Sequence, residues 1–555
     1  MSFNTRFAWP SLVVFIAATC VGCGGDSPST ANTVDGGGLT SRDASASVDL
    51  SADVGPCGTG DKAILADGTT VVSANLAIVS DNNTESGVAA INGGHVTLSD
   101  SSITKSNDGL CGGSGAATTS DASSTPASGG VPGVSSTGAA PASGAMPGDP
   151  FEGGLPPNGD MPGDPFDGGL PPNGDMPGDP FDGGAFGGMP PDGGMGPGGS
   201  SPEGSSGGGD STAAVGANSS GVYVGSNSTA TLSNLQISTA LEEGKALCAT
   251  GSGAAITLTK GTISTTGDSS HGAFATQGGS IKLTDVNITT AGQHCSTLAT
   301  DQGGGTVIAE GGTFVAKGEY SAGIYSTGDI RATNASFEAQ HDRVACMEGG
   351  SRITLTNCSL VAATKDAVII YQSFSGDSTV GVSEFTMTGG SITGKAADLP
   401  LFYVTNTHAT ISLTGVKLTS ASGLVLRALK GAWMDNPPNG AVPTQGGSVT
   451  FTVNNLTLPG DIELDEDSSI TAIFKDQSTM EGSIDASGKG KAMSLTLDGS
   501  SSWEVTADSH LTALTLASAS SISAPAGKSV LMTVDGVPTP ITAGAFEGAI
   551  VLTVQ

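Results

Sequence analysis

One short pattern of strands and turns recurs along most of the chain. Each copy has an apolar strand, a turn that is usually rich in glycine, a second strand such as Ile-x-Leu, a two-residue corner and a third short strand. Corresponding positions in successive copies are 24, 26, 22 and 23 residues apart, at Phe274, Leu298, Ile324, Cys346 and Ile369. A single copy cannot bury its apolar side, so the copies must stack and share one core. We therefore predict an all-β fold, a single-stranded right-handed parallel β-helix of about a dozen coils.

Asparagine and aspartate recur at one corner of the repeat, two residues after the second strand. These residues are Asp100, Asn234, Asp285, Asn334 and Asn357. Both residue types tolerate left-handed backbone geometry, and stacked side-chain amides can bond along the axis of the coils. We interpret this column as structural, in preference to a ladder of metal ligands.

Composition divides the chain into segments. The stretch 111–218 contains no Lys or Arg and holds three 15-residue copies with the core MPGDPF, starting at Met146, Met161 and Met176. Such a composition buries too little apolar surface to fold, so we expect a disordered insertion. The Asp535-Gly536 pair predicts a hairpin that caps the last coil. In chain order we predict a lipoprotein signal peptide at 1–22, a flexible tether at 23–56, first coils at 57–110, the insertion at 111–218, the main β-helix at 219–460, and irregular terminal coils with the cap at 461–555.

The first residues indicate export. Arg6 precedes an apolar stretch from Leu12 to Val21, which is shorter than the roughly 20 residues that span a bilayer. Val21-Gly22-Cys23 resembles a lipobox, which implies cleavage and lipidation at Cys23. Gly24 follows in place of the aspartate that favours inner-membrane retention, so we expect a lipid-anchored protein at the outer membrane or cell surface. An ordinary secreted protein, cut nearby, is the alternative.

The formal net charge is −32, from 52 acidic and 20 basic residues. Nucleic acids and anionic lipid surfaces are poor partners for such a chain, because like charges repel. The lipid is thus the expected membrane contact. The cap hairpin favours a monomer, because uncapped strand edges associate.

Eight cysteines are present, and six follow the lipobox, an even number that allows disulfides in an oxidising compartment. Cys57 with Cys111, and Cys346 with Cys358, are conceivable pairs. We expect Cys248, Cys346 and Cys358 to point inward. No Cys-x-x-Cys follows the signal peptide, so we predict no zinc site.

From Gly60 to Gln555 the chain resembles bacterial adhesin-like surface proteins with right-handed β-helix repeats and a pectin-lyase-like fold, here in lipoprotein form. The resemblance depends on the strings GDSSHGAFATQGG, STLATDQGGGTV, AGIYSTGDI, IIYQSFSGD, FTMTGGS and LFYVTNT, together with the Gly/Pro-rich insertion. It implies surface display and adhesion, and no chemistry.

Parallel β-helices also include polysaccharide lyases and glycosidases, which need paired carboxylates or calcium with an arginine base. The chain has no Asp-Asp pair, and the segment 267–272, GDSSHG, supplies one carboxylate. Asp461, Glu463, Asp465 and Asp467 alternate along one strand, but no arginine is near them in sequence. We therefore predict no catalytic residue, no metal and no cofactor.

Polar residues recur just before the first strand of successive coils, where they would line one edge of the stack. We predict a possible ligand edge, or a mixed acid/base cluster, at His271, His294, Glu319, Tyr320, His341, Asp342 and Arg343, followed by Lys365 and Asp366. A solvated turn column is the simpler alternative.

Two longer loops leave the coils after the first strand, at 372–381 with Phe374 and at 430–447 with Trp433. Aromatic faces there would pack on sugar rings or cover a patch of core. The leading hypothesis is a non-catalytic, adhesin-like surface lipoprotein that binds polysaccharide or another cell-surface ligand along the β-helix. A lyase or hydrolase acting on acidic glycans is the first alternative, and a structural envelope spacer is the second.

Overall fold

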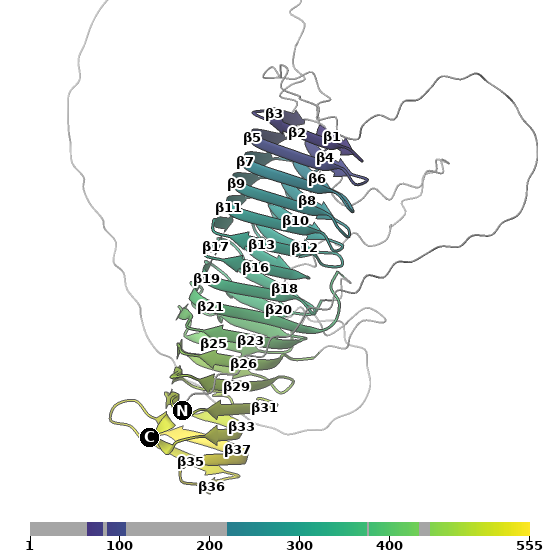
Figure 1. Ribbon diagram of the computed structural model, residues 1–555. Coiled ribbons are helices and arrows are strands. Elements are labelled where there is room, and N and C mark those ends of the chain that lie inside the picture. Colours follow the sequence, from purple (N-terminus) through teal and green to yellow (C-terminus); the bar gives the residue numbers. More distant parts are fainter. Residues whose placement is uncertain (1–63, 81–85, 107–218, 374–376, 432–444) are drawn as a thin grey trace, which may run out of the picture. The chain divides into compact units, whose positions relative to one another are not determined.

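The computed structural model describes residues 64–80, 86–106, 219–373, 377–431 and 445–555. These residues form a parallel β-solenoid of about 12 turns (Figure 1). The predicted all-β parallel β-helix is therefore confirmed. Among the described residues, no helix is long and apolar enough to cross a membrane.

Sheet A forms one side of the stack and contains one short strand from each coil. All of its strands pair in parallel, in coil order. The strands are β1 (Ile64–Asp67), β4 (Val88–Ile91), β6 (Val222–Val224), β8 (Leu247–Thr250), β10 (Ala273–Thr276), β12 (Leu298–Asp301), β15 (Ile324–Ser326), β18 (Ala345–Glu348), β20 (Val368–Tyr371), β22 (Phe402–Thr405), β25 (Leu424–Ala428) and β28 (Asp461–Leu464).

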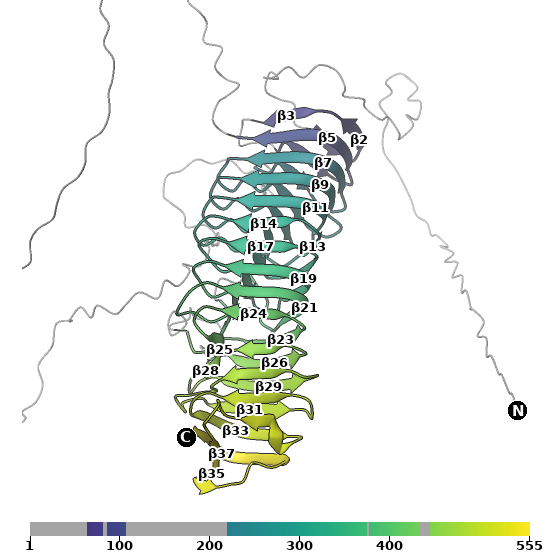
Figure 2. The same cartoon turned by 90° about the vertical axis from the view of Figure 1, so that its left-hand side faces the viewer.

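Sheet B forms the remaining sides (Figure 2). Several of its strands continue through the corner of the coil as one long strand, and elsewhere the corner divides them. They are β2 (Thr70–Ala74), β3 (Ala77–Ser80), β5 (His95–Lys105), β7 (Thr229–Thr239), β9 (Ala255–Thr265), β11 (Ser280–Thr290), β13 (Thr306–Glu310), β14 (Thr313–Ala316), β16 (Asp329–Thr333), β17 (Ser336–Ala339), β19 (Arg352–Ala362), β21 (Val382–Gly394), β23 (His408–Thr414), β24 (Lys417–Ser420), β26 (Ser448–Asn454), β29 (Ser469–Lys475), β31 (Ala492–Leu497) and β33 (Ser509–Leu516).

The stack continues across the long segment 107–218. β4 pairs with β6 and β5 pairs with β7, so His95 is the direct partner of Thr229. The predicted interruption of the early coils is consistent with this pairing. The segment itself lies outside the described residues, as do the predicted signal peptide and tether.

The corner residues have the left-handed backbone that the sequence predicts. Their φ angles are 49° at Asp100, 50° at Asn234, 53° at Asp285, 55° at Asn334 and 52° at Asn357. Asn234 Nδ2 donates to Asp100 Oδ1 at 2.8 Å, and Asn357 Nδ2 donates to Asn334 Oδ1 at 3.4 Å. Hydrogen bonds of this kind, donated by side-chain amides from one coil to the next, hold the corner in place. The structural interpretation of the column is therefore confirmed.

Alternate residues of each strand point into one continuous apolar core. Phe314 stacks on Phe337 from the next coil, with ring centroids 4.7 Å apart. Such stacks of like side chains recur because parallel, in-register coils place equivalent residues over one another.

The last coils are less regular and end in a cap. A small sheet C contains β27 (Thr457–Pro459), β30 (Thr479–Gly482), β32 (Ser502–Val505) and β34 (Ile522–Ser523), which follows a 3-10 helix, η2 (Ala519–Ser521). β35 (Val530–Val534) and β36 (Val537–Pro538) form a hairpin, and β37 (Gly544–Val554) inserts antiparallel between β33 and β35. Asp535 and Gly536 form the turn, with φ of 51° and 76°. The predicted cap hairpin is confirmed.

Two details of the sequence prediction are wrong. The structural partners of Phe274 are Ala299 and then Tyr325, so Leu298 and Ile324 were assigned one residue out of register. A shift of one residue places a side chain on the opposite side of its strand. Cys346 therefore points away from the core and not into it.

The cysteine assignments change accordingly. Cys248 lies beside Phe274 on the outer side of sheet A, whereas Cys358 lies in the core as expected. Cys358 is a buried thiol, so the predicted bridge from Cys346 to Cys358 is wrong. Cys57 and Cys111 lie outside the described residues, as does Cys23.

Candidate functional site

The side of sheet A that faces away from the core is apolar along most of its length. We call this row the outer stripe, and it consists of Tyr223, Cys248, Phe274, Ala299, Tyr325, Cys346, Ile369 and Tyr371. All of these side chains are buried. The outer stripe is therefore a second buried apolar cluster, separate from the core inside the coils.

The predicted edge residues divide into two groups. The His271 ring stacks on Phe274 with centroids 5.1 Å apart, and its Nδ1 accepts a hydrogen bond from the Ser296 N–H at 3.0 Å. His294 and Tyr320 stack on each other, also at 5.1 Å, and both have left-handed backbone. His271 covers part of the outer stripe, whereas His294 and Tyr320 form a ladder at a corner of the coils. The predicted single column is therefore corrected to two.

The remaining predicted edge residues differ in exposure. Glu319 and His341 are exposed, whereas Asp342 and Arg343 are buried. Arg343 Nε donates to Asp366 Oδ2 at 2.9 Å, and its Nη1 lies 3.3 Å from Asp342 Oδ1. Arg343 and Asp366 start successive coils, so one coil holds the guanidinium and the next holds its carboxylate.

Burial and charge act in opposite directions in this ionic cluster. Burial alone would lower the pKa of Arg343, but the carboxylates of Asp366 and Asp342 outweigh it and raise that pKa. Burial raises the pKa of Asp342, and the Arg343 charge only partly offsets it. Asp342 Oδ2 is buried and has no hydrogen-bond partner among the described residues. The cluster therefore holds one well-paired carboxylate and one that is poorly satisfied.

An aromatic and an ion pair continue the row beyond the outer stripe. Ile369, Tyr403, Arg427 and Glu463 follow one another in register on β20, β22, β25 and β28. Arg427 Nε donates to Glu463 Oε2 at 2.8 Å. Burial raises the pKa of the half-buried Tyr403, which also experiences the charges of Asp366, Arg343 and Arg427. Tyr403 is thus a half-buried residue that lies beside Arg427 in register and experiences the charge of Arg343.

Glu348 is a central residue that the sequence reasoning missed. It occupies an outward position of β18 and is buried. Its Oε2 accepts from the Tyr325 hydroxyl at 2.8 Å and from the Tyr371 hydroxyl at 3.2 Å. The hydroxyls of Ser373 and Ser378 donate to its Oε1. The sequence around Glu348 gives no sign of this role, because its hydrogen-bond partners come from three other segments of the chain.

The loop after β20 is held against the stack at both ends. Ser373 and Ser378 bond Glu348, and Asp377 O accepts from the Gly303 N–H at 3.3 Å. Gln372 Nε2 donates to Ser373 O and to Ser378 Oγ, both at 3.2 Å, but its Oε1 is buried with no partner among the described residues. The predicted aromatics of the two loops, Phe374 and Trp433, lie outside the described residues.

The alternating acidic residues in and just after β28 have structural partners. Asp461 Oδ1 accepts from the Ser483 N–H at 2.6 Å, and Asp465 Oδ2 accepts from the Lys430 N–H at 2.7 Å. Arg427, distant in sequence, pairs with Glu463. In the parts of the chain that the structure describes, no cluster of three or more His, Cys, Asp or Glu could hold a metal ion.

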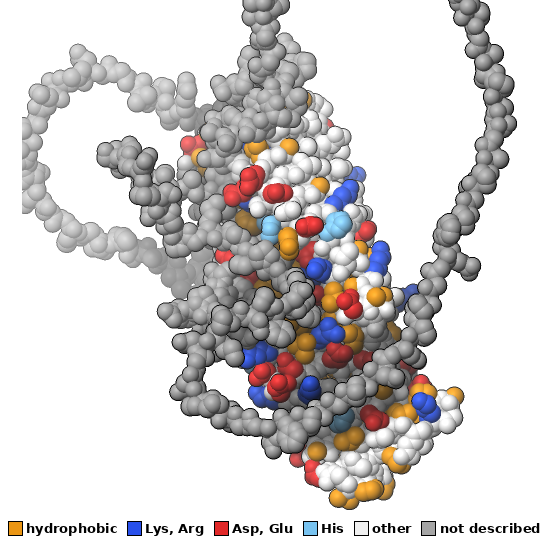
Figure 3. Space-filling model, turned by 180° about the vertical axis from the view of Figure 1, so that it is seen from behind, with side chains coloured by type: hydrophobic (Ala, Val, Ile, Leu, Met, Phe, Trp, Pro, Cys, Tyr) orange, Lys and Arg blue, Asp and Glu red, His pale blue; other side chains and the backbone are white. Residues whose placement is uncertain are grey.

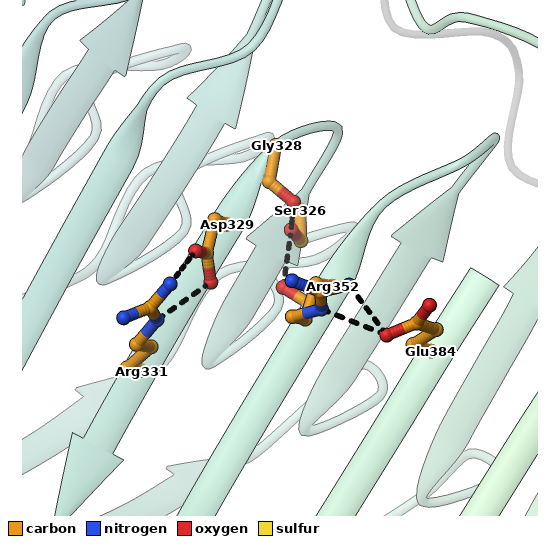
Figure 4. A network of polar contacts seen from close by, with 6 residues as sticks. All are labelled: Ser326, Gly328, Asp329, Arg331, Arg352 and Glu384. Atoms are coloured by element: carbon orange, nitrogen blue, oxygen red, sulfur yellow. Dashed lines mark hydrogen bonds and ion pairs between the residues drawn. The ribbon is translucent and has the colours of Figure 1, made fainter.

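The outer side of sheet B has a different chemistry. Arg331 Nε donates a hydrogen bond to Asp329 Oδ1 at 3.1 Å (Figure 4). Arg352 Nη2 lies 2.6 Å from Glu384 Oε2, in an ion pair. The side chains of Arg352 and Glu384 are 49% and 46% exposed, against 10% and 4% for Arg343 and Asp366. Figure 3 shows the side of the stack opposite to the view in Figure 1, where acidic and basic side chains lie among one another. Threonine and serine occupy much of the neighbouring row, at Thr354, Thr386, Ser412 and Thr452.

No protein-family model, curated protein or solved structure matches this chain. The site is therefore interpreted from its own geometry.

Proposed function

We propose that the protein is a non-catalytic binding module, exported and lipid-anchored at the cell surface, that binds polysaccharide on the outer side of sheet A between β18 and β25. The observation that carries this proposal is the partly exposed Tyr403, which lies beside Arg427 in register at the end of the outer stripe and also experiences the charge of Arg343. Sugar-binding sites usually pack an aromatic side chain against the face of a sugar ring and place polar groups beside it. The resemblance to adhesin-like surface proteins supports the same function.

The chemistry of Arg343 weighs against the lyase alternative. A lyase of the type considered above needs an arginine that gives up its proton to act as base. Arg343 is bound to two carboxylates, which raise its pKa and favour the protonated form. The two carboxylates share that one guanidinium. Binding is therefore favoured over proton abstraction at this cluster.

Glycan-array binding of the full-length protein tests the proposal. Tyr403→Ala removes the ring, and we expect it to weaken binding about tenfold, equivalent to 1.4 kcal/mol. Thr386→Ala, on the outer side of sheet B, is the matched control and should bind like wild type. The proposal fails if wild type binds no glycan, or if both variants bind equally well.

A further inference from the structure

A cavity of about 150 Å³ lies beside the cap, at the end of the stack where β33 pairs with β37 (Figure 1). The turn 485–490, which precedes β31, forms one wall, and residues of β33 and β37 form the others. The cavity is open to solvent on one side, and its lining is mostly apolar. A small molecule can therefore enter it from solvent.

A β-bulge shapes this space. The pairing of β33 with β37 shifts after Leu511, so that the single residue Thr512 lies opposite two residues of β37. The Thr512 hydroxyl donates to Met493 O and accepts from the Met493 N–H, both at 3.0 Å, which ties β33 to the start of β31. Bulges redirect side chains in this way and are often found next to functional sites.

His510 supplies the polar group of the cavity. Its Nδ1 lies 2.8 Å from Asp485 O, and a carbonyl oxygen can only accept, so Nδ1 carries a proton and donates it. In the neutral ring, Nε2 is then an acceptor with an in-plane lone pair. Within the described residues, the contact at Nδ1 is the only hydrogen bond of this ring.

Gly488 leaves space beside the Nε2 edge of that ring. A Cβ atom at this position would lie 3.1 Å from both Nε2 and Cδ2 of His510, and 3.2 Å from Cε1. Because these distances are nearly equal, such a Cβ would lie over the face of the ring and not in its plane. Glycine at this position, with φ of 66°, therefore keeps the face open and leaves the lone pair of Nε2 uncovered.

The charge in the cavity lining already has its hydrogen bonds. Asp485 is buried, and its Oδ1 accepts from the Ser487 hydroxyl at 3.0 Å and from the Lys489 N–H at 3.2 Å. Its Oδ2 accepts from the Gly490 N–H at 2.9 Å. A carboxylate bound in this way does not need a cationic ligand, and it repels an anionic one. The cavity therefore favours a neutral ligand.

We propose that this cavity binds a small neutral molecule with an apolar ring and one hydroxyl group, and that the hydroxyl donates a hydrogen bond to His510 Nε2. An apolar cavity of this volume holds a molecule about as large as benzene. It is too small for a sugar chain, since pockets for larger ligands enclose roughly 300–1,000 Å³. The site is thus separate from the glycan surface on sheet A and does not depend on it.

Fluorine NMR titration of the full-length protein with matched probes tests this proposal. The probes are para-fluorophenol, para-fluorotoluene, which has a methyl group in place of the hydroxyl, and the anion para-fluorobenzoate. We expect the phenol to bind about tenfold more tightly than the toluene, because one hydrogen bond to a neutral acceptor has about that effect. The benzoate should not bind. Equal affinity for phenol and toluene, tight binding of the benzoate, or no binding of any probe would overturn the proposal.

Variants locate the binding in the cavity. His510→Phe keeps a ring but removes the acceptor, so phenol and toluene should bind equally well. His408→Phe changes an exposed histidine on the outer side of sheet B and should keep the wild-type preference. Ala549→Leu enlarges an exposed residue of the lining and should weaken both probes. A preference for phenol that persists in His510→Phe, or wild-type affinity in Ala549→Leu, would show that the probes bind elsewhere.

Discussion

The outer sides of sheets A and B come from the same coils but have opposite character. The outer stripe of sheet A is apolar and buried, and the ion pair that lies just before β18 and β20, Arg343 with Asp366, is almost without solvent. On sheet B the outward row is rich in hydroxyl side chains, and its ion pair, Arg352 with Glu384, is about half exposed. The solenoid needs only its inward residues for the core. The outward residues are therefore free to specialise, and on sheet A they form the candidate site.

Breaking the buried ion pair should have the largest effect on stability. Arg343→Ala leaves Asp342 and Asp366 buried without their cation. Removing one partner of a buried pair costs about 3–5 kcal/mol, and we expect a loss of that order in the free energy of unfolding, measured in urea. A loss below about 1 kcal/mol would show that the outer side of sheet A is hydrated like that of sheet B.

Asp342 should give an effect of intermediate size that depends on pH. Burial raises its folded-state pKa above the ordinary value of 3.8, so the folded protein holds this proton more tightly than the unfolded chain does. The stability from that proton is present below 3.8 and is lost as pH rises through the folded pKa. Asp342→Asn should therefore raise the unfolding free energy at neutral pH by roughly 1–3 kcal/mol.

Denaturation of wild type and Asp342→Asn at several pH values measures this difference. The gain in unfolding free energy of Asp342→Asn should shrink as the pH falls. It should vanish where Asp342 is protonated in both the folded and the unfolded state. A gain that stays constant with pH would contradict the assignment to the Asp342 charge.

The smallest effect is expected on sheet B. Arg352→Ala removes an exposed ion pair, and such pairs contribute about 0–1 kcal/mol. Urea denaturation should therefore barely distinguish this variant from wild type, and added salt should remove any difference. A loss comparable to that of Arg343→Ala would mean that the two outer sides do not differ energetically.

Local signals in the sequence were enough to predict the coils, the corner column and the hairpin. Asn and Asp at one corner, and Asp535-Gly536 in the hairpin, tolerate the left-handed backbone that these turns require. The register of sheet A was missed by one residue, because strands such as Ala273–Thr276 are buried on both sides and show no alternation. Alternation sets register only where one side is polar.

The candidate site was predicted only in part. Asp342 and Arg343 were singled out by their place before a strand, but the pairing of Arg343 with Asp366 depends on coil stacking. The roles of Glu348, Tyr403 and Gln372 depend on partners from other coils and loops. A single sequence has no signal for such contacts, because turn lengths vary from one coil to the next.

The corner bonds of the stack connect residues about one repeat apart, 23 residues in the pair Asn334 and Asn357. Because the strands of each coil pair with those of the coil before it and the coil after it, duplication or deletion of one whole coil outside the stretch joined by Gly303 and Asp377 leaves the other strand pairings and the cap intact. The protein can therefore change length in evolution by single steps of roughly 4.8 Å. A change of this kind between the cap and β25 would move the candidate site relative to the end of the stack without altering its geometry.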